Sequence, residues 1–130
     1  MPRKKLPISR LKNKAWDVVS KWVRFTAANE HGIVLCVTCD SKHFWKDIQA
    51  GHFIHGHAKP TFLVLMNVHP QCVQCNHFKS GNLEKYREFM VKQYGEGSVE
   101  ALRQLSHKIW KPTRDELEGI ITKYNIAEEP

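Results

Sequence analysis

Cys36-Val-Thr-Cys39 and Cys72-Val-Gln-Cys75 are two C-x-x-C pairs, separated by 32 residues, and they decide how the centre of this chain folds. Four cysteines in an intracellular chain are seldom disulfides, because the cytosol keeps thiols reduced. Two pairs at this spacing favour tetrahedral coordination of Zn(II) by four thiolates, with redox pairs or buried free thiols as the alternatives. A zinc ion with four sulfur ligands has no open position for water, so we expect a structural ion that joins the two pairs.

The rest of the composition is typical of one compact domain. The chain has 130 residues, of which 42% are hydrophobic and 25% charged, close to the globular average. Its longest apolar runs, residues 33–37 and 62–66, have only five residues, whereas a membrane helix needs about 18. The basic N-terminus lacks the apolar stretch of a secretion signal. These features predict a soluble, cytoplasmic protein with no membrane partner.

The positive charge is concentrated at the start of the chain. Residues 1–24 contain eight Lys and Arg against Asp17 alone, which accounts for the whole formal net charge of +7. A basic segment on a neutral body predicts an arm that grips DNA phosphates without sequence preference; a solubilising tail is the alternative. The candidate DNA contacts are Arg3, Lys4, Lys5, Arg10, Lys12, Lys14 and, beside the second cysteine pair, Lys79.

The spacing of apolar residues predicts an α+β fold. We expect a helix over residues 9–28 with Ser9 as its N-cap, extended segments over 33–37 and 45–54, and a buried strand or turn over 62–68. Helices over 82–94 and 98–106 follow, and Thr113-Arg-Asp-Glu116 is a capping box that opens a last helix. The expected parts of the single domain are a basic arm and helix (1–32), a zinc-stapled core (33–95) and a helical extension (96–130).

Histidines and asparagines cluster between and just after the two cysteine pairs. They lie in Gly51-His52-Phe-Ile-His55-Gly-His57, at Asn67, and in Asn76-His77-Phe-Lys79. Their order resembles the HNH subclass of the ββα-metal (His-Me finger) nucleases. The resemblance implies a ββα-metal core in which His52 is the general base, Asn67 orients its imidazole by hydrogen bonding, and Asn76 ligates one divalent cation.

Phosphodiester hydrolysis explains why these residue types occur together. The reaction needs an activated water and a cation that neutralises charge on the phosphorus and the leaving oxygen. A neutral imidazole is a usable base, since its ordinary pKa is near 6.5. An oxygen ligand such as Asn76 suits Mg(II) or Mn(II). The sequence therefore predicts a structural zinc and a separate catalytic cation.

Gly51 departs from the HNH pattern, in which an Asp or His often precedes the base and serves as a second cation ligand. Another residue must then supply that ligand: His55 and His77 are the preferred candidates, and His57 and Asp47 are further ones. His52 could itself bind the cation while another group acts as base. Solvent-exposed loop positions without a catalytic role are the alternative for His55 and His57.

A longer set of motifs is similar to the NinG (Rap) family of recombination endonucleases from lambdoid phages. The motifs are Gly51-His-Phe-Ile54, Asn67-Val-His-Pro-Gln-Cys-Val-Gln-Cys-Asn76, Lys79-Ser-Gly-Asn82 and Tyr86-Arg87, and the similarity covers roughly residues 33–125. It implies an endonuclease that cleaves branched DNA, such as D-loops and Holliday-type junctions, during phage recombination in the bacterial host.

Two further expectations concern partners. Two active sites suit branched DNA, so we expect a homodimer whose interface is the apolar stripe around Trp16 and Trp22. The alternative function is a non-catalytic, zinc-stabilised DNA-binding protein that assists recombination or annealing, which the missing acidic ligand at Gly51 favours.

Overall fold

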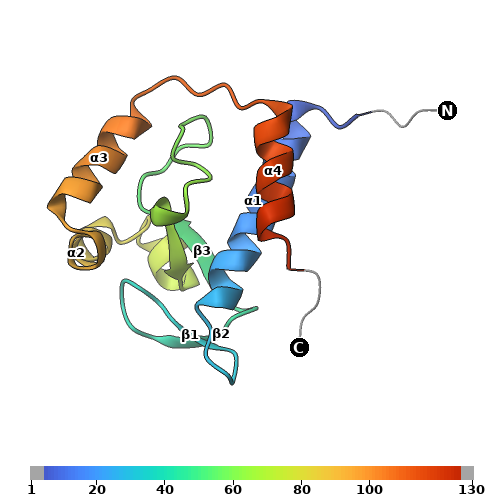
Figure 1. The fold of residues 1–130 in the computed structure, drawn as a ribbon. Coiled ribbons are helices and arrows are strands. Elements are labelled where there is room, and N and C mark those ends of the chain that lie inside the picture. Colours follow the sequence, from blue (N-terminus) through green and yellow to red (C-terminus); the bar gives the residue numbers. More distant parts are fainter. Residues whose placement is uncertain (1–4, 127–130) are drawn as a thin grey trace.

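The computed structural model describes residues 5–126 and places the strands between two groups of helices (Figure 1). Helices α1 and α4 lie side by side on one side of the strands, and α2 and α3 lie on the other. The order is α1 (Ile8–Thr26), β1 (Ile33–Leu35), β2 (Lys42–Phe44), β3 (Gln49–His52), η1 (Leu65–Asn67), β4 (Val68–Gln71), η2 (Gln74–Phe78), α2 (Leu83–Tyr94), α3 (Glu96–Ser106) and α4 (Arg114–Tyr124). This mixed architecture confirms the α+β prediction.

The strands form two short antiparallel ribbons. In the first, β1 pairs with β2; in the second, β3 pairs with β4, so that Gln49 lies opposite Gln71 and His52 opposite Val68. A two-stranded ribbon is marginal by itself in water. The β3–β4 ribbon is supported by α1, which packs against both strands, and by α2, whose Tyr86 hydroxyl donates to the carbonyl of Gly51 at 2.7 Å. The end of β3 is therefore held from both sides.

Helix α1 is part of the core rather than a detached arm. Its buried residues recur at every fourth position, which gathers them on one face; they are Leu11, Ala15, Val19 and Val23. This face packs in one cluster with Leu117 of α4 and Phe62 of the loop before η1. The predicted N-cap at Ser9 is wrong. The helix begins after Pro7, whose carbonyl accepts from the N–H groups of Arg10 and Leu11, each at 3.0 Å.

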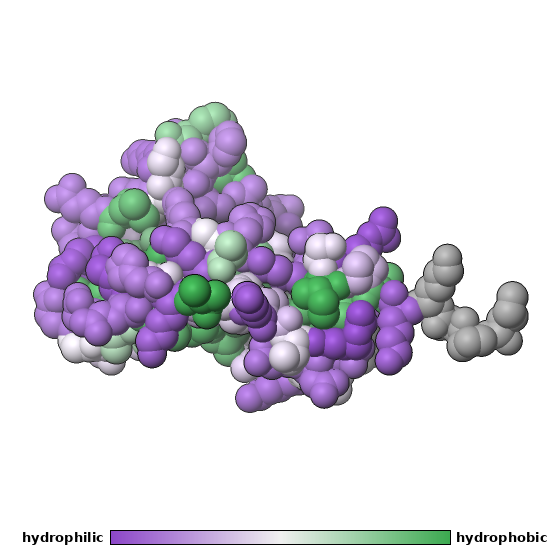
Figure 2. Space-filling model, turned by 90° about the horizontal axis from the view of Figure 1, so that it is seen from above, coloured by the Kyte–Doolittle hydropathy of each residue, from purple (hydrophilic) through white to green (hydrophobic). Residues whose placement is uncertain are grey.

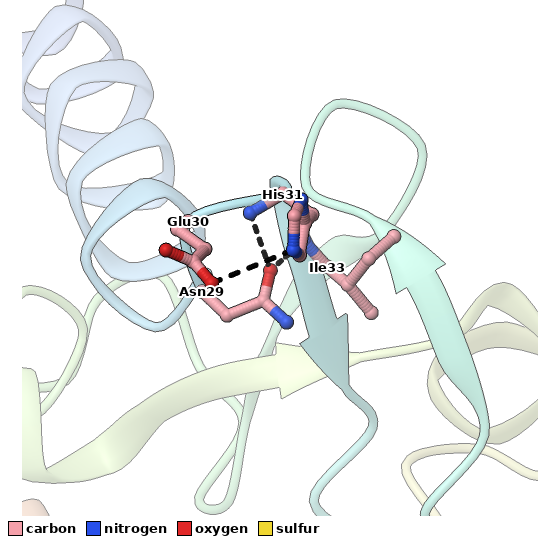
Figure 3. A network of polar contacts seen from close by, with 4 residues as sticks. All are labelled: Asn29, Glu30, His31 and Ile33. Carbon is pink, nitrogen blue, oxygen red and sulfur yellow. Dashed lines mark hydrogen bonds and ion pairs between the residues drawn. The ribbon is translucent and has the colours of Figure 1, made fainter.

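A side-chain turn connects α1 to β1 (Figure 3). The Asn29 Oδ1 atom accepts from the backbone N–H groups of His31 and Ile33, both at 2.9 Å, which is the local bonding that makes Asn favourable in turns. The exposed side chains of Glu30 and His31 approach to 3.5 Å beside it. The turn sets the direction of β1, which is followed directly by Cys36.

The extended segment expected over residues 45–54 is shorter than predicted. The structure has β2 before it, a turn over residues 45–48, and β3 only from Gln49 to His52. Trp45 and Ile48 are buried together with Val34 around the cysteines, because a turn brings residues three apart to the same side. The segment over residues 62–68 is likewise mostly turn and η1, and it enters β4 only at Val68.

The helices of the second half lie close to their predicted positions. α2 and α3 occupy the segments expected at 82–94 and 98–106, with α3 starting two residues earlier, at Glu96. The capping box of α4 is present: Glu116 N–H donates to Thr113 Oγ1 at 3.2 Å, and Thr113 N–H donates to Glu116 Oε2 at 3.3 Å. These features depend on local sequence, which explains why the pattern predicted them.

The apolar stripe of α1 is used inside the chain. Trp16 stacks on His52, and Trp22 makes an edge contact with Tyr124 of α4. Helix α4 and the loop bearing Phe62 pack against this stripe, and its use as a dimer interface stays a prediction. The face in Figure 2 is mainly hydrophilic, with separate small hydrophobic areas. Within residues 5–126, no helix combines the length and apolar character needed to cross a membrane.

Candidate active site and metal centre

The four cysteines come together as the sequence predicts. Their sulfur atoms all lie within 4.8 Å of one another, and Cys39 Sγ is 3.7 Å from Cys72 Sγ. Four sulfurs arranged tetrahedrally at about 2.3 Å from one zinc ion would be about 3.8 Å apart. The cluster could therefore hold a metal ion such as zinc.

The surroundings of the cluster suit thiolates bound to a cation. Burial raises the pKa of the Cys72 thiol to about 11, so a bound cation is needed to keep it ionised at neutral pH. The Cys75 N–H donates to Cys72 Sγ at 3.5 Å, and Asn82 Nδ2 donates to Cys75 Sγ at 3.6 Å. Hydroxyl groups of neighbouring residues lie close to Cys36 and Cys39. Such outer contacts orient metal ligands.

A cleft of about 600 Å³ lies on the α1 side of the β3–β4 ribbon. Four predicted site residues line it: His52 from β3, His55 and His57 from the following loop, and Asn76 from η2. Asn76 directly follows Cys75, so the backbone of this amide residue is adjacent to the cysteine cluster. The cleft is lined by Trp16, Ser20, Arg24, Ile48, Gln49, Ala50, His52, His55, Gly56, His57, Phe62 and Asn76.

The imidazole of His52 has a defined tautomer. Its Nε2 atom lies 2.9 Å from the carbonyl oxygen of Phe62; because a carbonyl only accepts, Nε2 carries the proton and Nδ1 is left as the basic nitrogen. The ring stacks between Trp16, with centroids 4.4 Å apart, and Phe62, at 5.2 Å. Burial lowers the pKa of His52, and His55 and His57 lower it further, against the opposing effect of the Phe62 carbonyl. The imidazole is therefore neutral at pH 7.

Asn67 does not orient His52 directly, and the expected hydrogen bond between them is wrong. Its fully buried amide binds the backbone of the loop after β3: Oδ1 accepts from Ile54 N–H at 2.8 Å, and Nδ2 donates to the carbonyls of Ile54 and Thr61 at 2.9 and 3.1 Å. The orienting partner of His52 is instead the carbonyl of Phe62, the residue after Thr61. Asn67 thus positions the His52 side chain through the loop that carries this carbonyl.

The other proposed cation ligands are divided between the cleft and the surface. His55 and His57 line the cleft, and His57 stacks on Phe62 at 4.7 Å. His77 is exposed and makes an edge contact with Phe78, and neither it nor Asp47 is among the described residues that line the cleft. The structure therefore brings His55, and not His77, to the side of His52.

None of the described basic residues that were predicted to contact DNA lines this cleft. Arg3 and Lys4 lie outside the described residues. Lys5, Arg10, Lys14 and Lys79 are exposed. Lys12 is half-buried, with its ammonium 4.9 Å from the ring centre of Trp110 and 5.3 Å from that of Phe62.

Sequence reasoning missed the helix residues that form one wall of the cleft. Trp16, Ser20 and Arg24 are spaced by four along α1, so they share one face, and all three line the cleft. The Arg24 side chain is held by hydrogen bonds to the carbonyls of Ser20 at 3.1 Å and Trp45 at 3.3 Å. Their helical spacing was the available signal, but nothing local shows that this face meets a histidine about 30 residues later.

A buried relay on the other side of β3 fixes the backbone just before His52. Tyr86 OH donates to the Gly51 carbonyl at 2.7 Å, so it accepts from His69 Nδ1 at 3.1 Å, and the Tyr94 hydroxyl donates to His69 Nε2 at 2.7 Å. Burial lowers the pKa of His69 to about 4. This chain of hydrogen bonds requires a neutral His69, because Nε2 must accept the hydrogen bond from the Tyr94 hydroxyl.

Comparison with known proteins places the chain in a family. The model of the family described as Bacteriophage Lambda NinG protein matches residues 3–128. The chain is 33% identical over 92 residues to the ninG proteins of Salmonella phage P22 and Escherichia phage 933W, and 32% identical over 92 residues to that of Escherichia phage lambda. Each alignment covers 68% of this chain but only 43% or 44% of the relative, so the chain matches less than half the length of these proteins. No solved structure matched the chain significantly. Since the family match spans almost every residue, this chain belongs to the bacteriophage lambda NinG protein family.

Proposed function

We propose that this protein is a metal-dependent DNA endonuclease of the HNH type. The observation that carries the proposal is the cleft in which His52, with Nε2 bonded to a backbone carbonyl and Nδ1 left basic, lies beside Asn76. A separate cluster of four thiols adjoins the same turn, η2. An antiparallel pair of strands followed by helical segments that carry the amide supports the HNH assignment.

In this proposal, His52 acts as the general base. Its Nδ1 accepts a proton from the water that attacks the phosphodiester, and the Phe62 carbonyl stabilises the resulting imidazolium through the Nε2 proton. The lowered pKa keeps the imidazole in its proton-accepting form at neutral pH. Stacking on Trp16 and Phe62 restricts rotation of the ring, so Nδ1 keeps one direction.

Asn76 is the proposed ligand of the catalytic cation. Its Nδ2 donates to Gln49 Oε1 at 2.9 Å, which leaves Oδ1 as the ligand atom, and His55 is the further candidate from the same cleft. Amide oxygens are ligands that hard divalent cations accept. Mg(II) or Mn(II), when bound, would neutralise charge on the phosphate and on the leaving oxygen.

The zinc ion in the thiol cluster is proposed to be structural. Four sulfur ligands leave no position for a water or a substrate oxygen. The ion would join the turn after β1 to the turn η2, and a small domain with two short ribbons gains stability from such a link.

DNA is the proposed substrate because the chain offers cations near the cleft. The formal net charge is +7, Arg24 lines the cleft, and Lys12 lies beside Phe62. Lys5, Arg10, Lys14 and Lys79, and by sequence Arg3 and Lys4, would add phosphate contacts without base readout. The proposal includes three further points, which follow the resemblance to phage recombination endonucleases. The protein would prefer branched recombination intermediates, act in the cytoplasm of the phage host and form a homodimer with two clefts.

The second candidate is a non-catalytic, zinc-stabilised DNA-binding protein. Gly51 favours it, because this position has no side chain that could bind a cation. The two candidates differ in whether the cleft performs chemistry.

A nicking assay separates these candidates. Branched and linear duplexes are incubated with Mg(II) or Mn(II) and with wild type, His52→Ala, Asn76→Ala or the matched control His31→Ala, an exposed histidine in the turn before β1. We expect wild type and His31→Ala to cut, and the two cleft variants to bind DNA but cut at least about 100-fold more slowly. Binding without cutting by wild type on every substrate would reject the nuclease.

A further inference from the structure

Two amide oxygens converge beside Gly51, directly before the proposed base. A Cβ atom built on Gly51 would clash with Gln71 Oε1 and would lie 2.9 Å from Asn76 Oδ1. Both oxygens therefore lie within 2.9 Å of a single point. Two acceptors this close to one point repel each other unless a cation or a proton donor binds both of them.

The orientation of both amides is determined by their nitrogen atoms. Gln71 Nε2 donates to the Gly81 carbonyl at 2.8 Å and to Thr38 Oγ1 at 3.2 Å. Reversing this amide would put its oxygen against the Gly81 carbonyl, so Oε1 must point toward Gly51. Asn76 Nδ2 donates to Gln49 Oε1, and with both amides in this orientation Asn76 Oδ1 points toward Gly51.

The oxygen of Gln71 has no partner in the described part of the chain. The side chain is fully buried, with 0% exposure, and Oε1 accepts no hydrogen bond there. An unpaired buried acceptor is destabilising, and native proteins normally satisfy such groups with protein, water or an ion. Gln71 is therefore arranged to bind something beside Asn76.

We propose that Gln71 Oε1 and Asn76 Oδ1 together ligate the divalent cation, so that Gln71 replaces the ligand that residue 51 cannot supply. The catalytic role of this cation rests on the nuclease function proposed above, whereas its binding by the two amide oxygens does not. Oxygen-only donors of this kind suit Mg(II) or Mn(II), and not the thiol-bound zinc.

The same geometry explains why residue 51 has no side chain. Gly51 is not among the positive-φ glycines, so its backbone does not require glycine. What excludes a side chain is Gln71, whose oxygen occupies the place where a Cβ would lie. A glycine at 51 and an inward-pointing glutamine at 71 are thus two parts of one arrangement, and exchanging them as a pair should preserve the site.

The test measures Mn(II) binding by the zinc-loaded full chain, using electron paramagnetic resonance of free Mn(II), with zinc content and circular dichroism as checks on folding. Gln71→Ala removes the proposed ligand, and Gly51→Ala keeps Gln71 but pushes its oxygen aside. The double variant Gly51→Asp/Gln71→Ala moves the ligand to position 51 and frees the space for it. Gln74→Ala, an exposed glutamine on η2, is the matched control.

We expect Gln71→Ala and Gly51→Ala to weaken Mn(II) binding at least about tenfold, the control to bind as wild type does, and the double variant to recover most of the affinity. Wild-type affinity in folded Gln71→Ala, or no Mn(II) binding by wild type, would overturn the assignment. If Gln71→Ala does not fold, the Mn(II) affinities of Gly51→Ala and the double variant decide.

The cation site and the nuclease function can fail separately. If Gln71→Ala weakens Mn(II) binding and wild type cuts no DNA, the cation site is supported and only the nuclease function is rejected. If wild type cuts DNA and Gln71→Ala binds Mn(II) as wild type does, only the role of Gln71 as a ligand is rejected.

Discussion

Trp16 of the first helix stacks on His52 at the end of β3, with ring centroids 4.4 Å apart and an angle of 24° between the planes. The basic N-terminal helix is therefore one wall of the cleft, and the residue proposed as the base is held by an aromatic ring from a distant part of the chain. Phe62 covers the other side of the imidazole and also provides the carbonyl that accepts its Nε2 proton. Loss of either ring should therefore disturb the position of the histidine as well as the stability of the fold.

Replacing Trp16 with alanine should impair catalysis beyond its effect on stability. The change removes a stacking partner and leaves a space, so we expect a loss of about 2–3 kcal/mol in the free energy of unfolding and at least a roughly tenfold lower single-turnover cleavage rate by the folded protein. Trp22→Ala, which loses the contact with Tyr124, is the control with a comparable stability loss. Equal slowing of cleavage in both variants would show that stability alone accounts for the effect.

The two proposed metals should be separable by mutation. Cys36→Ser removes one of the four sulfurs and should release zinc and unfold the centre, because the remaining three thiols cannot close the coordination shell. Asn76→Ala should keep zinc and the fold while losing Mn(II)-dependent cleavage. Zinc content by mass spectrometry and far-ultraviolet circular dichroism measure both effects. Similar zinc loss from the two proteins would contradict the division into two sites.

The buried His69 should make the fold sensitive to acid. Its pKa is about 4 in the folded chain against 6.5 for an ordinary histidine, so the unfolded state binds the proton more tightly. The stabilising effect of the neutral ring is complete above about pH 6.5 and is lost as the pH falls toward 4; between pH 7 and pH 5 it should decrease by about 2 kcal/mol. Protonation also places a donor at Nε2, opposite the Tyr94 hydroxyl.

Urea unfolding at pH 7 and pH 5 checks this expectation against His69→Phe, which keeps the ring volume and cannot titrate. Both proteins contain the same thiol cluster, so acid release of zinc affects them alike. Wild type should lose about 2 kcal/mol more than the variant over this range. An identical loss in the two proteins would mean that another group controls the acid sensitivity.

Asn67→Ala should loosen the loop between β3 and η1. The variant leaves the Ile54 N–H and the carbonyls of Ile54 and Thr61 without their partner, so we expect a loss of about 3 kcal/mol in stability. Amide hydrogen exchange over residues 53–62 should accelerate, and cleavage should slow because the Phe62 carbonyl no longer holds His52 firmly. The exposed Asn13→Ala on α1 is the control. Unaltered exchange in the loop would show that other contacts hold it.

Local sequence determined much of this molecule. The cysteine spacing predicted the thiol cluster because each C-x-x-C pair is formed within one turn, so only the meeting of two turns was left to the fold. The helices α1, α2 and α4 followed from apolar periodicity and, for α4, from the capping box at Thr113. His52 and Asn76 were recognised because their order along the chain matched a family motif, and His55 was a candidate for the ligand that Gly51 lacks. The structure brings these three to one cleft.

Only the tertiary structure decided which groups contact the residues of the candidate site and of the cysteine cluster. Trp45 and Ile48 form part of a turn rather than a strand, because burial around the cysteines overrides their β propensity. Phe62 rather than Asn67 holds His52, Trp16 comes to it from α1, and the oxygen of Gln71 points at Gly51. Each of these contacts joins segments that are distant in sequence and are brought together by tertiary packing. The periodicity of a single helix or strand carries no information about such neighbours.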